Sequence, residues 1–180
     1  MRCALKLHPG SPSLAATHVE IAVSRPRAGN LVLRYNVTGN IDDLRLASVV
    51  AAARADALWR HTCFEAFLRA VPEAGYYEFN FAPSTQWAAY RFSGYRSAMC
   101  IATEIDAPRI AVQSAPACYT LQASLELDRL PASASPWRLG LSAVIEDANG
   151  NRSYWALAHP PGKPDFHHAD CFALEVCVLG

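Results

Sequence analysis

The sequence lacks a long hydrophobic run. Lys6, Pro9 and Gly10 interrupt the apolar residues near its N-terminus. A secretory leader needs roughly 7–15 uninterrupted apolar residues and a membrane-spanning helix needs about 20. We therefore predict a cytoplasmic protein with neither a signal peptide nor a membrane partner.

An excess of charge of either sign is also missing. Sixteen basic residues balance sixteen acidic ones, so the formal net charge is zero with histidine neutral. Nucleic acids and anionic membranes usually attract proteins with a basic excess. We therefore expect a small-molecule ligand and no nucleic-acid partner, and the sequence leaves open whether a protein partner exists.

Motifs for disulfides, phosphate binding and catalysis are missing as well. The six cysteines include no C-x-x-C pair, and we expect buried, reduced thiols that act as small apolar residues. The sequence contains no G-x-S-x-G, no glycine-rich phosphate loop and no H-E-x-x-H. These absences favour a protein that is not an enzyme, although Glu65 and Glu78 could form the carboxylate pair of a glycosidase.

What the chain does have is a regular series of short, alternating apolar segments. Twelve prolines and nine glycines separate them, and β-branched and aromatic residues favour strands over helices. We predict one all-β domain over residues 1–180, an antiparallel β-sandwich of ten to eleven strands. The strands are expected near 4–9 and over 17–25, 30–39, 57–70, 75–83, 86–93, 109–114, 118–128, 137–147, 153–160 and 171–179.

Two local features of this pattern make sharper predictions. The alanine-rich segment 41–56 is the only helix-like stretch, and an irregular loop is the alternative for it. Asn149-Gly150 lies between two strand-like segments, and this dipeptide is typical of a tight type I′ hairpin turn.

Polar residues recur on one face of the central predicted strands. In "LWRHTCFEAFLRA" (58–70), alternation places Trp59, His61 and Glu65 on one face and an apolar set on the other. Glu78 and Asn80 alternate in the same way on the next segment, and we place Arg91 with them. Indole, carboxylate, amide and guanidinium groups together suit a saccharide, because rings stack on its apolar faces and planar polar groups bind its hydroxyls. The alternative is a solvated outer face with cross-strand ion pairs.

The C-terminal "HPPGKPDFHHADC" (159–171) is the other dense polar region. Its prolines predict an extended loop. The loop's three histidines (His159, His167 and His168), two aspartates (Asp165 and Asp170) and Cys171 could ligate zinc, although their spacing matches no tight metal signature. Met99 with one of the six histidines could alternatively ligate haem. The loop could otherwise hold neighbouring strands together or border the polar face.

Three blocks of the sequence resemble the DOMON-like family related to family-nine carbohydrate-binding modules. They are "LWRHTCFEAFL", "YYEFNFAPSTQWAAYRFSGYR" and "YWALAHPPGKPDFHHADCFALE", which span most of residues 58–175. Trp59 and Glu65 match the tryptophan and glutamate that share a strand in the sugar-binding modules. The resemblance implies that Trp155 is the second tryptophan of an aromatic sandwich around a sugar. The histidine-rich loop departs from the pattern of those modules.

The resemblance is to the soluble, bacterial, single-domain branch of the family, and it implies ligand binding without catalysis. We expect no cofactor, and the alternative function is a metal- or haem-binding protein that uses the histidine-rich loop. The predicted ligand-binding residues are Trp59, His61, Glu65, Asn80, Gln86, Arg91, Trp155, His167, His168 and Asp170.

Overall fold

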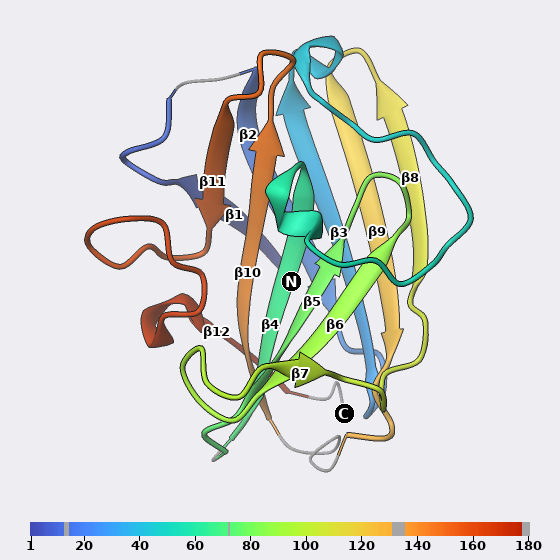
Figure 1. The fold of residues 1–180 in the computed structure, drawn as a ribbon, viewed down its shortest axis with the longest axis vertical. Coiled ribbons are helices and arrows are strands. Elements are labelled where there is room, and N and C mark those ends of the chain that lie inside the picture. Colours follow the sequence, from blue (N-terminus) through green and yellow to red (C-terminus); the bar gives the residue numbers. More distant parts are fainter. Residues whose placement is uncertain (13–14, 72, 131–135, 178–180) are drawn as a thin grey trace.

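The structure is a computed structural model, and it describes residues 1–12, 15–71, 73–130 and 136–177. Twelve antiparallel strands form one curled sheet whose two halves pack against each other, as in a β-sandwich (Figure 1). The all-β prediction is confirmed. The strands are β1 (Arg2–Leu7), β2 (Ala16–Ser24), β3 (Asn30–Gly39), β4 (Cys63–Ala70), β5 (Tyr76–Phe81), β6 (Trp87–Phe92), β7 (Cys100–Ile101), β8 (Arg109–Ala115), β9 (Cys118–Glu126), β10 (Trp137–Glu146), β11 (Arg152–Ala156) and β12 (Leu174–Val176).

The order of the strands places the middle of the chain in one layer. That layer runs β7-β6-β5-β4-β10-β11, with β12 also paired to β10, and the other runs β2-β3-β9-β8. Strand β1 pairs with both β11 and β2 and so joins the layers at one side. Two layers with inward-facing apolar side chains enclose one core, which is the usual way to stabilise antiparallel sheets.

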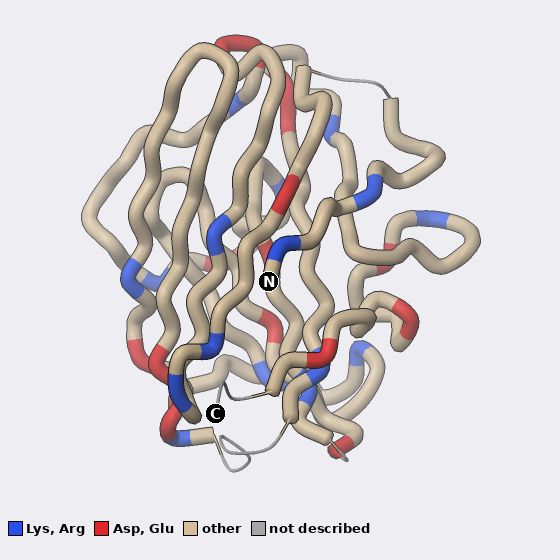
Figure 2. The backbone as a smooth tube through the Cα atoms, turned by 180° about the vertical axis from the view of Figure 1, so that it is seen from behind, with Lys and Arg blue, Asp and Glu red and all other residues tan. Residues whose placement is uncertain are grey.

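The alternation of side chains along β4 shows how the core forms. Phe64, Ala66 and Leu68 point between the layers and are at most 1% exposed. Tyr35 of β3 reaches across from the opposite layer and donates a hydrogen bond to the backbone oxygen of Glu65 at 2.7 Å. The face of β4 that sequence alternation assigns to the core is therefore confirmed. Figure 2 shows basic and acidic positions interspersed along the backbone, without a stripe of one sign.

Segment 41–56 is not a helix, so the irregular alternative was the right one. It begins with a single 3-10 turn, η1 (Ile41–Asp43), and then runs irregularly around the sheet (Figure 1). Its backbone bonds to the edge of β6: Trp87 donates to Ala53 at 3.0 Å and accepts from Ala55 at 2.9 Å. Arg54 lies over the Trp87 ring at 4.2 Å and donates to two carbonyls nearby. These tertiary bonds outweigh the helical preference of the alanines.

The β10–β11 hairpin forms at the predicted place, but with a different turn. Gly150 has a φ of +83°, whereas Asn149 is not among the residues with positive φ, which a type I′ turn would require. Asp147 instead organises the loop, because its carboxylate accepts from the backbone of Asn149 and Asn151 at 2.9 Å.

Within the described residues, helical structure is limited to three 3-10 turns: η1, η2 (Leu58–Arg60) and η3 (Ala169–Cys171). None of the helices in this part of the chain has the length and apolar character needed to cross a membrane.

Candidate functional site

The outer face of the β6-β5-β4-β10-β11 layer carries a cavity of about 400 Å³. A second apolar cluster covers this face, and the C-terminal loop contributes Phe166 and Phe172 to it. The side chains that point outward from these strands are therefore covered and do not form a solvated surface. The cavity is lined by Trp59, Glu65, Glu78, Phe92, Arg96, Met99, Val144, Arg152, Tyr154, Pro164, Phe166 and His167.

Strand register brings two carboxyl groups to the floor of the cavity. Glu65 pairs across the sheet with Asn80 on one side and Ser142 on the other. Glu78, two residues before Asn80 on β5, projects from the same face. Glu65 and Glu78 are 3% and 6% exposed. Ser142 donates to Glu65 at 3.3 Å, and the Asn80 amide donates to Glu78 at 2.7 Å.

Burial changes the acidity of both carboxyls in the same direction. Desolvation raises the pKa of Glu65 well above its usual range and the charge on Glu78 raises it further, against the hydrogen bond from Ser142. Desolvation also raises the pKa of Glu78, while the Asn80 hydrogen bond and the charge of Arg96 oppose the rise. The floor therefore offers polar oxygens that can accept, and when protonated also donate, hydrogen bonds.

His167 stands over this floor as a neutral, mostly buried imidazole. Its Nδ1 lies 2.8 Å from the hydroxyl of Tyr76, which itself accepts from the backbone amide of Arg96 at 3.1 Å. The Tyr76 hydroxyl can therefore donate its proton to Nδ1. Neutral His167 then carries its own proton on Nε2, which lies 3.7 Å from the Glu78 carboxylate. Burial, assisted by the charge of Arg96, lowers the pKa of His167 to about 4.

Trp59 forms a partly open aromatic wall. The prediction that Trp59 shares a strand with Glu65 is wrong, because β4 begins only at Cys63 and Trp59 lies in the 3-10 turn η2 before it. This turn follows Ala57, a residue in the left-handed region at φ 58°. The indole contacts the edge of Tyr90 at a ring-centroid distance of 5.9 Å and stays 38% exposed. Tyr90 is fixed in turn by a 2.7 Å hydrogen bond to Asp56. A supported ring with one free side is suited to stacking on an apolar ligand face.

Loop 93–99 forms another part of the cavity rim, through Arg96 and Met99. Arg96 and Ala98 have positive φ values of 50° and 48°, which non-glycine residues adopt at an energetic cost. Arg96 binds the Asp165 carboxylate at 2.8 Å and thereby ties this loop to the C-terminal loop. Desolvation alone would raise the pKa of Asp165, but the hydrogen bonds from Tyr95 and Arg96 and the charge of Arg96 together lower it. The C-terminal loop therefore borders the face through Pro164, Phe166 and His167, as one of the sequence interpretations predicted.

Trp155 does not join Trp59, and the predicted pair of facing indoles is wrong. Trp155 is 5% exposed and packs in the core between the layers, where its indole N–H donates to Ser153 at 2.9 Å. Pairing of β10 with β11 sets Trp155 opposite the core residue Ala143 and sets Tyr154 opposite Val144. Alternation along the strand therefore delivers Tyr154, the preceding aromatic residue, to the cavity.

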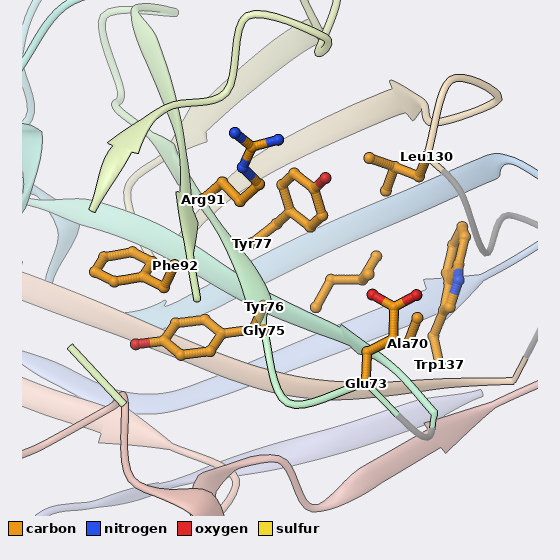
Figure 3. Close-up of a pocket in the computed structure, with 10 residues that line it drawn as sticks. Ala70, Glu73, Gly75, Tyr76, Tyr77, Arg91, Phe92, Leu130 and Trp137 are labelled. Carbon is orange, nitrogen blue, oxygen red and sulfur yellow. The ribbon is translucent and has the colours of Figure 1, made fainter. Parts of the chain in front are cut away.

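Arg91 also lies on the wrong face for the predicted site. The β5–β6 hairpin pairs Asn80 with Ala88 and Tyr77 with Arg91. Arg91 consequently stands with Tyr77, away from Phe92 and Tyr76 (Figure 3). Its guanidinium pairs with Glu104 at 3.3 Å and is 55% exposed. The cavity receives its guanidinium groups from Arg96 and Arg152 instead.

Four other predicted residues lie outside the cavity. His61 and Gln86 border a separate opening of about 460 Å³. His61 bonds there to the buried carboxylate of Glu146 at 2.6 Å. His168 is the N-cap of η3 and accepts from the Asp170 amide at 3.2 Å, and both side chains are exposed.

The histidine-rich loop does not gather its donors into a metal centre. His159 binds the backbone oxygen of Lys6, His167 binds Tyr76, and His168 caps a turn. Over the described parts of the chain, no three histidine, cysteine or acidic side chains are placed so that they could hold one ion.

Of the predicted set, the structure brings Trp59, Glu65 and His167 together in the cavity, with Asn80 bonded to Glu78 beneath it. The prediction missed Arg96, Met99, Arg152, Tyr154 and Phe166. In the sequence, only the glycine and the two serines of "SGYRSAM" (93–99) mark this segment as a loop.

Comparison with known proteins supports the fold. No protein-family model and no curated protein matches the chain. Among solved structures, a candidate carbohydrate-binding protein from Bacteroides uniformis superposes with a TM-score of 0.62 at 12% identity, over 94% of this chain and 83% of the other. A family-nine carbohydrate-binding module from Caldicellulosiruptor kristjanssonii, in complex with glucose, gives a TM-score of 0.54 at 12% identity, over 98% and 85%.

The fold resembles that of a family-nine carbohydrate-binding module. At 12% identity the likeness concerns the fold alone, since one fold can host many functions. The DOMON-like relationship stays a prediction.

Proposed function

We propose that this chain is a non-catalytic domain that binds a small carbohydrate in the cavity bordered by Trp59, Glu65 and Glu78. One observation carries the proposal. The same cavity contains the indole of Trp59, which packs on Tyr90 and stays partly exposed, and a floor of buried hydrogen-bonding groups. A pyranose has an apolar C–H face and a ring of hydroxyls, so it needs both kinds of surface. The cavity volume of about 400 Å³ lies within the usual range for small-molecule sites.

The charges of the cavity also suit a neutral, hydroxyl-rich ligand. Glu65 and Glu78 accept hydrogen bonds from hydroxyls, whereas Arg96, Arg152 and the Nε2–H of His167 donate them. The two signs are both present, so neither a strongly anionic nor a strongly cationic ligand is favoured over a polar neutral one.

A hydrolytic role is less well supported. Glu65 and Glu78 are at most 6% exposed, and each is already bonded within the protein, Glu65 to Ser142 and Glu78 to Asn80. The two structural neighbours are described as carbohydrate-binding, not as hydrolases. We therefore assign both carboxyls to ligand binding.

Tryptophan fluorescence tests the proposal directly. Trp87, Trp137 and Trp155 are at most 5% exposed, so Trp59 is the indole that a ligand can contact. We expect glucose or another mono- or disaccharide in a broad panel to shift the emission, and Trp59→Phe to remove the shift. Calorimetric titration of the same panel gives the affinities. If no sugar in the panel binds by either method, the proposed function is wrong.

A further inference from the structure

A second opening of about 290 Å³ adjoins the candidate sugar cavity. His167 borders both, so its ring is a shared wall. This opening, called the aromatic recess below, is rich in rings and holds one guanidinium. It is lined by Arg69, Ala74, Tyr76, Tyr95, His167, His168, Ala169 and Phe172.

The wall between the two openings is a bonded unit. Tyr76 connects His167 to the backbone of Arg96, as described above. Consecutive residues of loop 93–99 then serve the two sides, since Arg96 lines the sugar cavity and Tyr95 lines the aromatic recess. A ligand that fills the first opening and extends past His167 therefore meets Tyr95 next.

Tyr95 is exposed and yet held in place. At 60%, its exposed fraction is among the highest of the large hydrophobic residues that the structure describes. Its hydroxyl donates to the same Asp165 carboxylate that binds Arg96, and its ring meets the edge of His168 at 6.5 Å. An exposed ring whose orientation is already fixed loses little conformational entropy when a ligand stacks on it.

The recess also provides polar groups at its edge. The Arg69 guanidinium lies 4.8 Å over the Phe172 ring, which orients it next to the opening. The exposed imidazole of His168 stands near Tyr95. Rings with donors at their border repeat the chemistry of the main cavity on a smaller scale.

We propose that the ligand is a linear oligosaccharide, with a first residue in the sugar cavity and a second residue stacked on Tyr95 in the aromatic recess. This inference rests on the proposed function, because it extends the same site by one sugar. It assigns Tyr95 the role of a chain-length determinant, separate from the contacts that hold the first residue.

The experiment compares glucose with short gluco-oligosaccharides of the α-1,4 and β-1,4 series, from two to four residues, by calorimetric titration. We expect one series to bind about fivefold more tightly than glucose, as one added aromatic contact of about 1 kcal/mol implies. Tyr95→Ala should remove this gain and leave the glucose affinity within about twofold. Tyr95→Phe retains the ring but loses the hydroxyl bond to Asp165 that holds it in place, so it should keep only part of the gain.

Ile101→Ala is the matched control, since Ile101 is 49% exposed and lines neither opening. Thermal melting confirms that each variant is folded. If glucose binds but neither series gains affinity with length, or if Tyr95→Ala weakens glucose as much as the oligosaccharides, the inference fails while the proposed function stands. If no sugar binds at all, both fail.

Discussion

Trp59 and Trp155 should respond to substitution in opposite ways. Trp155 is 5% exposed in the core and its indole N–H is bonded to Ser153. Removing a buried tryptophan costs about 3–5 kcal/mol through lost burial and a cavity. For a chain of this size 1 kcal/mol moves the melting temperature by about 2–4 °C, so Trp155→Ala should melt about 6–20 °C lower.

Trp59 is 38% exposed and its ring contacts that of Tyr90. Losing such an aromatic pair costs about 0.5–1.5 kcal/mol, so Trp59→Ala should melt only about 1–6 °C below the parent. The same variant should lose about fivefold or more in sugar affinity, because one aromatic contact contributes about 1 kcal/mol or more.

Differential scanning calorimetry and sugar titration measure the two effects on the same samples. Trp155→Phe keeps a ring in the core and covers the case in which Trp155→Ala does not fold. It should be less stable than the parent but bind sugar with unchanged affinity. The assignment of the two indoles would be refuted if Trp155→Phe lost sugar binding while Trp59→Ala kept it.

Three further predictions concern stability. Burial raises the pKa of Glu65, so the folded state prefers the protonated group, and its contribution falls as the pH rises above the unfolded value of about 4.3. Urea unfolding at pH 7 should therefore find Glu65→Gln more stable than the parent, and a less stable variant would contradict this. His167 has a folded pKa of about 4 against about 6.5 unfolded, so unfolding free energy should fall by about 3 kcal/mol as the pH falls from 6.5 to 4. His167→Gln should lose this slope, and an unchanged pH profile would argue against a buried neutral imidazole. Gly150→Ala should destabilise by about 1 kcal/mol, because φ is +83° there, whereas Gly94→Ala enters open space and should unfold at the same urea concentration as the parent.

Much of the fold could be predicted because the relevant signals are local. β-Branched and aromatic residues mark ten of the predicted strands, and alternation on β4 separates Phe64 from Glu65 correctly. The two-residue β7 and the irregular course of segment 41–56 depend on bonds to β6, which the sequence around them does not record.

The site was less predictable because its membership depends on register between strands. Adjacent residues Tyr154 and Trp155 look equally suited to a sugar, and only the pairing of β11 with β10 decides between them. Arg91 was misplaced for the same reason, since the β5–β6 hairpin fixes which face it takes. Arg96 and Met99 reach the cavity from a loop, where no periodicity indicates direction.

The segment that runs along β6 has a consequence for engineering this protein. The backbone N–H and C=O of Trp87 are hydrogen-bonded to Ala53 and Ala55, and the backbone N–H of Ala102 donates to the carbonyl of Ala89. An uncovered strand at that position would present these groups to another molecule, which is how sheet edges start intermolecular strand pairing. Segment 41–56 has the irregular appearance of a dispensable loop. Shortening it should nevertheless produce concentration-dependent association, even where the remaining sheet keeps its fold.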